Sequence, residues 1–151
     1  MIRHLLVATV TTALLGLTSF TVHAASTPQI MAGSPTGRNV AFIFDKGTSS
    51  ELGGELRIAT HLVGNPGARL SIWVDHSRHP LFSRILSTDD CKYGDDGARC
   101  RVVVEGRSPA YRQFVISFKR GRTVHVEVRN AGVMQMSEDV SLVGFTRNYG
   151  G

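Results

Sequence analysis

The sequence predicts a mainly β protein, built as a single-domain β-sandwich or partly open barrel with one short helix and one disulfide. Short apolar or alternating segments recur between turn residues, and 16 Gly and 5 Pro supply those turns. Only one segment has helical periodicity, and only two cysteines are present. With 42% hydrophobic and 19% charged residues, the 151-residue chain has enough apolar material for one core.

The amino terminus has the pattern of an export signal. Arg3 precedes an apolar stretch that continues to Val22, and Val22-His23-Ala24 places small residues three positions and one position before a cleavage site. We expect residues 1–24 to be a signal peptide. An uncleaved anchor is the alternative, because about 18 mostly apolar residues can just cross a bilayer. The Ser and Thr residues within the stretch weaken it as a permanent span, so we expect no stable membrane span after cleavage.

Residues 25–38 carry Pro and Gly among Ser and Thr, which is typical of a flexible linker, and residues 39–151 form the predicted β-sandwich domain. An exported protein would be periplasmic or secreted. Cys91 and Cys100 would then lie in an oxidising compartment, where an isolated pair predicts a structural disulfide. Their spacing does not make a C-x-x-C redox motif, and closing so short a loop stabilises the fold by roughly 2–3 kcal/mol.

The first strand predicted is the short apolar run at residues 40–44. Residues 55–63 and 69–75 alternate, and the Gly64-Asn65-Pro66-Gly67 segment between them predicts a hairpin. Trp73 then lies with the polar residues, and the residues expected to face inward are Leu56, Ile58, Leu70 and Ile72.

Residues 108–120 have the period of a helix. Ser108 is suited to the cap, Pro109 to the first helical position, and Lys119, Arg120 and Gly121 to the end. The apolar residues that recur at helical spacing, and that we expect to pack in the core, are Tyr111, Phe114, Val115 and Phe118. A strand through Phe114-Val115-Ile116 is the alternative.

Strands are also predicted on both sides of this helix. Residues 101–105 form one, and residues 123–129 alternate strictly, with His125 and Glu127 on the face opposite three valines. Asn130-Ala131-Gly132 turns the chain, and residues 133–145 return as a strand that we expect to be broken near Ser137-Glu138-Asp139.

The segment from Asp75 to Leu86 is the leading candidate for a binding surface, because it follows a predicted strand and combines rings with guanidinium groups. Its candidate contact residues are Asp75, His76, Arg78, His79, Phe82 and Arg84. The alternative is that the apolar residues of the segment belong to the core while its charges are only solvated. Those apolar residues are Leu81, Phe82, Ile85 and Leu86.

Two candidate metal sites are alternatives to a binding surface in this segment. His76 and His79 are close enough in sequence to bind zinc or copper, but the other histidines, His61 and His125, lie on separate predicted strands, and a solvated loop is favoured. Around Cys91, the pairs Asp89-Asp90 and Asp95-Asp96 offer oxygens to calcium, yet their spacing is not that of an EF-hand. Turn formation accounts for these aspartates, and we expect no cofactor.

Catalytic motifs are missing from the sequence, which has no G-x-S-x-G, H-E-x-x-H or P-loop pattern. We therefore expect a protein that is not an enzyme, with a small hydrolase as an alternative, since a triad can assemble from distant residues. Cleavage of the signal would leave 16 basic against 12 acidic residues. This excess favours anionic partners, such as lipid headgroups, acidic polysaccharide or an acidic protein, and a location outside the cytoplasm makes nucleic acid a poor candidate. The basic residues are also scattered among acidic ones, and a solvated surface of mixed charge is the favoured interpretation.

The carboxyl-terminal half resembles the invasion-associated locus B family of exported bacterial proteins. The resemblance is carried by residues 70–75, the pair Cys91 and Cys100, residues 118–124 around Lys119-Arg120-Gly121, and residues 140–149 with their Ser-Leu-x-Gly-Phe segment. In that family a strand bearing an Asp precedes a turn bounded by cysteines, a short helix ends in a basic-Gly step, and the Ser-Leu-x-Gly-Phe-like segment closes the last strand. The resemblance implies an envelope-associated accessory or host-interaction protein with no assigned catalytic centre.

The sequence thus predicts a non-catalytic periplasmic or secreted module that binds an envelope or host protein, a glycan or another envelope component. The first alternative is a periplasmic metal-binding protein that uses His76 and His79. An inhibitor or immunity protein, which shares this size, compartment and disulfide, is a further alternative.

Overall fold

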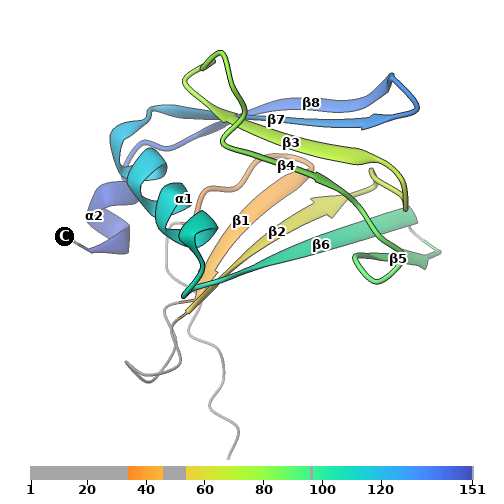
Figure 1. Ribbon diagram of the computed structural model, residues 1–151, viewed down its shortest axis with the longest axis horizontal. Coiled ribbons are helices and arrows are strands. Elements are labelled where there is room, and N and C mark those ends of the chain that lie inside the picture. The colour runs from red at the N-terminus through yellow and green to blue at the C-terminus, as the bar shows by residue number, and fades with distance from the viewer. Residues whose placement is uncertain (1–33, 46–53, 96, 151) are drawn as a thin grey trace, which may run out of the picture.

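Two four-stranded antiparallel sheets and two short helices make up the part of the chain that the computed structural model describes, residues 34–45, 54–95 and 97–150 (Figure 1). The prediction of a mainly β fold with one disulfide is confirmed, and the sheets do not close into a barrel. The predicted signal peptide and residues 25–33 of the predicted linker lie outside the described residues. Among the described helices, none has the length and apolarity needed to cross a membrane.

The first sheet has the strand order β1-β2-β6-β5. Its strands are β1 (Val40–Asp45), β2 (Glu55–His61), β5 (Cys91–Gly94) and β6 (Gly97–Glu105). The second sheet has the order β4-β3-β7-β8. Its strands are β3 (Arg69–Val74), β4 (Phe82–Ile85), β7 (Thr123–Asn130) and β8 (Val133–Ser141).

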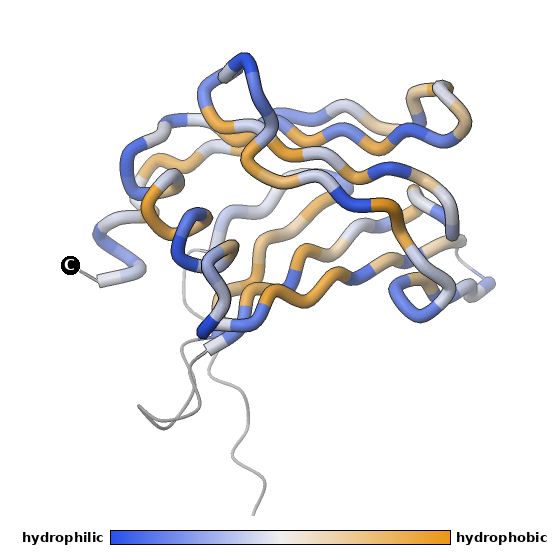
Figure 2. Tube along the Cα trace, in the orientation of Figure 1, coloured by the Kyte–Doolittle hydropathy of each residue, from blue (hydrophilic) through white to orange (hydrophobic). Residues whose placement is uncertain are grey.

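The core lies between the facing sides of the two sheets, because apolar residues alternate with polar ones along the central strands (Figure 2). The first sheet buries Val40, Phe42, Phe44, Leu56, Ile58, Val102 and Val104, and the second buries Leu70, Ile72, Val124, Val126, Val128, Met136 and Val140. The predicted inward positions on β2, β3 and β7 are therefore confirmed, and Trp73 does lie on the opposite face, paired with His125.

Helix α1 (Pro109–Arg120) covers one end of the sandwich beside the shorter α2 (Phe145–Tyr149) (Figure 1). Six of the seven phenylalanines join Tyr111 and Tyr149 in an aromatic cluster at this end, with ring centroids 5.1 to 6.1 Å apart. Phe118 and Phe145 are almost fully buried, and Tyr111 Oη lies 2.9 Å from Tyr149 Oη. The apolar face of α1 thus belongs to the core, as predicted.

The two sheets are joined at both long edges. At one edge, the Glu138 carboxylate of β8 accepts hydrogen bonds from the N–H groups of Arg38 and Asn39, just before β1. At the other edge, Arg84 Nη2 of β4 donates to both carboxylate oxygens of Asp90, at 3.0 and 3.1 Å, just before β5. Each sheet is therefore tied to the other by a carboxylate that lies between them.

The predicted hairpin of residues 55–63 with 69–75 is wrong. β2 pairs with β1 and β6 in the first sheet, whereas β3 pairs with β4 and β7 in the second. Leu62, Gly64 and Gly67 have positive φ angles of 63°, 95° and 90°, which carry the chain across from one sheet to the other. Both strands still bury the expected residues, because alternation fixes which face is inward but not which strand is the neighbour.

The structure also differs from the sequence prediction at β8, at α2 and at the short strands β4 and β5. β8 runs without a break past Ser137, and its irregularity lies opposite Val128 and Arg129 instead. The second helix, α2, was not predicted, and residues 142–145 turn into it rather than extending the strand. β4 and β5 were also missed, because four-residue strands offer too few positions for alternation to be read.

Candidate functional site

A hollow of ≈ 610 Å³ opens on the outer face of the first sheet. Its floor includes Ala41 and Ala59, which pair with each other on β1 and β2 and point away from the core. Arg101 pairs with Ala59 on the next strand. Ala41 and Ala59 carry only methyl groups, so the longer side chains around them project beyond them and leave a depression in the surface.

Basic side chains surround this floor, and we call the site the basic hollow. Its cations are Arg38, Lys92, Arg99 and Arg101, joined by His61, and its carboxylates are Asp89 and Asp90. The cations come from the segment before β1, from β5 and from β6, so they span the whole width of the sheet. Among the carboxylates that the structure describes, none forms an ion pair with Arg38, Lys92 or Arg101.

The Asp90 carboxylate does not neutralise the cations of the basic hollow, because Ser87 and Arg84 already bind it. It accepts hydrogen bonds from the N–H and hydroxyl groups of Ser87, both at 2.7 Å, and from Arg84. Partial burial alone would raise the pKa of Asp90, but these hydrogen bonds and the charge of Arg84 outweigh it and lower the pKa. The carboxylate therefore stays ionised and directed at Arg84.

A second group of chemically active side chains lies on the outer face of the second sheet. His76, His125 and Asp139 each offer a ligand atom within 4.8 Å of the others, and we call them the histidine–carboxylate trio. The register explains this, because His125 on β7 pairs with Asp139 on β8. His76 comes from the turn after β3, and its ring centroid lies 5.7 Å from that of His125.

His125 is held between two carboxylates. Its Nδ1 lies 2.7 Å from Asp139 Oδ1, and its Nε2 lies 3.3 Å from Glu127 Oε1. Burial alone would lower the pKa of His125, but the hydrogen bonds to Asp139 and Glu127 outweigh it and raise the pKa. Glu127 is in turn held by Arg129 Nε at 3.0 Å. The imidazole is thus fixed in orientation, with a carboxylate at each nitrogen.

The turn that carries His76 is fixed by Asp75. Both residues have positive φ angles, 48° and 53°, and Ser77 N–H donates to the carbonyl of Val74. Asp75 Oδ1 accepts hydrogen bonds from the N–H groups of Arg122 and Thr123, each at 2.9 Å, and these lower the pKa of Asp75. The role of Asp75 is therefore to fasten this turn to the start of β7.

The remaining candidate contact residues do not form one surface. His79 lines a separate hollow of ≈ 390 Å³ with Gln113 and Ile116 of α1, so His76 and His79 face different surroundings. Phe82 packs against Phe114 with ring centroids 5.5 Å apart, and Arg84 binds Asp90. Arg78 is exposed.

The apolar residues of the same segment are divided between core and surface. Leu86 is buried, and Leu81 and Phe82 pack partly against the core, whereas Ile85 is 48% exposed. Neither of the two sequence interpretations of residues 75–86 thus describes the whole segment.

The cysteine pair is placed as predicted. Cys91 and Cys100 form a disulfide between directly paired positions of β5 and β6. Of the four aspartates considered for calcium, Asp89 and Asp90 line the basic hollow, Asp95 is exposed, and Asp96 lies outside the described residues.

Sequence reasoning missed both sites. Arg38, Lys92 and Arg101 are scattered among acidic residues along the chain, and only the strand order β1-β2-β6-β5 brings them together. His125 was placed on the outer face correctly, but its pairing with Asp139 follows from the β7–β8 register. The two-residue turn at Ala131-Gly132 would by itself place His125 opposite Glu138, and the bulge beside Val128 and Arg129 shifts its partner to Asp139, so the sequence did not show this pairing.

The fold and these sites define a two-sheet antiparallel sandwich with one disulfide, a basic hollow outside one sheet and a histidine–carboxylate trio outside the other. The chain matches no protein-family model, no curated protein and no solved structure.

Proposed function

We propose that this protein is an exported, non-catalytic module that binds an acidic polysaccharide of the cell envelope in the basic hollow. The observation that carries the proposal is a hollow of ≈ 610 Å³ with four cationic side chains, in which one of the two carboxylates is engaged by Arg84. Guanidinium groups bind carboxylate, sulfate and phosphate oxygens through paired hydrogen bonds. Anionic groups are therefore the ligand chemistry that this surface favours.

The distribution of the cations favours a chain of negative charges over a single small anion. Arg38 precedes β1 at one edge of the sheet, and Lys92 lies on β5 at the other edge. Neighbouring strands are about 4.8 Å apart, so the cations span roughly 14 Å across the four strands. A polymer with repeated carboxylate or sulfate groups can contact several of them at once, whereas one small ion cannot.

Export is supported by the signal pattern of residues 1–24 and by the disulfide, which forms in oxidising compartments. The resemblance to the invasion-associated locus B family points to the same compartment. Fractionation of cells followed by mass spectrometry tests this part of the proposal. We expect a mature chain that begins near Ala25, with both cysteines oxidised, outside the cytoplasm. An intact Met1 form inside cells, with both thiols free to alkylation, would contradict export.

Binding is tested by titrating the protein with polygalacturonate and dextran sulfate, with neutral dextran as the comparison. We expect saturable binding to the two anionic polymers, weakening as salt is added, and none to dextran. Lys92→Glu combined with Arg101→Glu should weaken it by at least about tenfold, because two attractions become repulsions.

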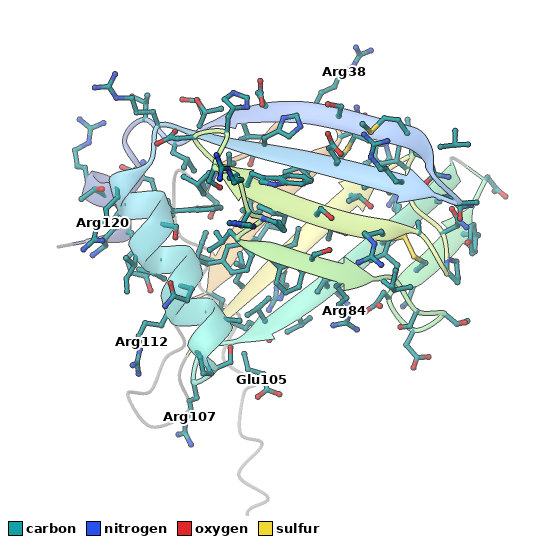
Figure 3. All side chains as sticks on the ribbon, turned by 45° about the horizontal axis from the view of Figure 1, so that its top comes forward. Arg38, Arg84, Glu105, Arg107, Arg112 and Arg120 are labelled. Atoms are coloured by element: carbon teal, nitrogen blue, oxygen red, sulfur yellow. A yellow bond between two sulfur atoms is a disulfide. The ribbon has the colours of Figure 1, made fainter. Side chains whose placement is uncertain are left out.

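The matched control is Arg112→Glu with Arg120→Glu, which makes the same change of charge on α1, where both side chains point away from the sandwich (Figure 3). This control should change the affinity less than about twofold at physiological salt, because exposed charges further apart than the Debye length of about 8 Å are screened. Equal weakening by the two double variants would show that net charge alone attracts the polymer and would refute a site in the basic hollow.

A further inference from the structure

The histidine–carboxylate trio takes no part in the proposed function, since it lies outside the other sheet. Two imidazoles and a carboxylate meet there, on a surface where the row Trp73, His125, Asp139 crosses three strands. Each of these side chains is at least partly accessible to solvent. A ligand could therefore reach the trio without any movement of the backbone.

We propose that His76, His125 and Asp139 bind a single divalent transition-metal ion, Zn²⁺ or Cu²⁺, on the outer face of the second sheet. Nitrogen and carboxylate ligands in this combination suit these two ions, whereas Ca²⁺ and Mg²⁺ require oxygen ligands. The site supplies three protein ligands, and solvent completes the coordination. This inference does not depend on the basic hollow or on its ligand.

The distances between the ligand atoms are compatible with such an ion. Ligands around a tetrahedral zinc ion, with bonds near 2.0–2.1 Å, lie about 3.3 Å from one another. His125 Nδ1 and Asp139 Oδ1 are 2.7 Å apart, and all three ligand atoms lie within 4.8 Å. The Asp139 side chain is 54% exposed and His76 is exposed, so small side-chain rotations can bring the trio to the required spacing.

The position of Glu127, beside Nε2 of the His125 ring, also supports a metal site at the histidine–carboxylate trio. If Nδ1 of His125 binds the ion together with Asp139, Nε2–H of His125 donates to Glu127 Oε1, at 3.3 Å. A carboxylate behind a ligating histidine is the usual arrangement at zinc sites, because it fixes the ring and makes the ligating nitrogen more basic. Arg129 Nε donates to Glu127 Oε2, at 3.0 Å, and holds this carboxylate in place on the sheet.

The position of His76 is also determined by the fold. A turn with two successive positive φ angles, 48° at Asp75 and 53° at His76, directs the chain back over β7, and Asp75 fastens that turn to Arg122 and Thr123. Positive φ is uncommon for residues other than glycine. The fold thus maintains an uncommon backbone geometry at the residue that completes the trio.

The test is calorimetric titration of the natively produced chain, without a polyhistidine tag, with Zn²⁺ alone and with Cu²⁺ alone. We expect one equivalent to bind and to raise the melting temperature. His76→Ala and Asp139→Asn should each weaken the affinity by at least about tenfold, and Glu127→Gln by about tenfold as a supporting residue. His79→Ala and His61→Ala are the matched controls, and each should change it less than about twofold.

Histidine NMR of the unaltered protein provides a readout that does not depend on the folding of any variant. Stoichiometric Zn²⁺ should shift the ring resonances of His76 and His125 and leave those of His79 and His61 in place. Absence of saturable binding, unshifted His76 and His125 resonances, or equal loss of affinity in His79→Ala and His76→Ala would each refute the site.

Discussion

Glu138 of β8 holds the segment that enters β1. Its two carboxylate oxygens accept the N–H groups of Arg38 and Asn39. Gly37 lies directly against this carboxylate, and a Cβ atom at position 37 would also lie 2.8 Å from Val140 Cγ2. A larger residue at position 37 would therefore displace the side chains of Glu138 and Val140 at this edge.

Glu138→Ala should lower the free energy of unfolding by about 2 kcal/mol, because two backbone N–H groups lose an ionised acceptor. Chemical denaturation measures this change. Glu105→Ala is the matched control, since Glu105 is exposed and points to solvent (Figure 3), and it should cost less than about 0.5 kcal/mol. Equal effects of the two substitutions would contradict the role of Glu138 at this edge.

Asp90 should make the stability depend on pH. Because Ser87 and Arg84 lower its pKa in the folded state, its stabilising effect is present above the unfolded value, near 3.8, and is lost as the pH falls through the lower folded value. Asp90→Asn should therefore be less stable than the unaltered protein at neutral pH, and the difference should shrink below about pH 4. Urea denaturation at several pH values measures it, and a difference that stays constant down to pH 2 would contradict this.

At the scale of single elements, α1 is the one whose boundaries the sequence predicts most fully. Ser108 caps it by accepting the N–H of Tyr111 at 3.2 Å, Pro109 occupies the first position, and Lys119 and Arg120 lie in the last turn. These signals are local, so they can be read without knowledge of the rest of the fold.

Ser108→Ala should cost about 1 kcal/mol of stability, because the helix loses the acceptor for one of its free N–H groups. Ser108→Asp, which keeps an acceptor and places a negative charge at the amino end of α1, should retain the stability of the unaltered protein. Thermal and urea denaturation of both variants give the comparison. A loss of the same size in both would show that the hydroxyl's donation to Glu105 O, rather than the cap, is what matters.

Pairing between elements is what the sequence leaves undetermined. Leu56 and Ile58 on β2, and Leu70 and Ile72 on β3, are buried as alternation predicts, yet their strands lie in different sheets. A Gly-Asn-Pro-Gly connection is compatible with a hairpin and with a crossing between sheets, since positive φ at Gly64 serves either turn. Only the long-range packing of the whole core decides between them.

The candidate sites also depend on pairing between elements, which the sequence leaves undetermined. Cys91 and Cys100 are close in sequence, and their disulfide is predicted correctly. His76 and His79 are equally close, but the turn at Asp75 separates them and places His76 against His125, far along the chain. Cys91 and Cys100 meet because β5 and β6 pair with each other, whereas no such pairing joins His76 to His79.

At the scale of the whole molecule, the disulfide closes one end of the first sheet beside the basic hollow. Replacing both cysteines, by Cys91→Ser with Cys100→Ser, should lower the free energy of unfolding by roughly 2–3 kcal/mol, because the unfolded chain regains the freedom of a short loop. Denaturation of the unaltered protein with and without reductant is the direct comparison. Equal stability of the oxidised and reduced forms would contradict a structural role for the bond.

Because the basic hollow and the histidine–carboxylate trio lie outside opposite sheets, the apolar core stands between them and they share no side chain. Sites so separated usually act additively. If both proposals hold, one molecule can bind a polymer outside one sheet and a metal ion outside the other, and we expect neither ligand to change the affinity for its counterpart.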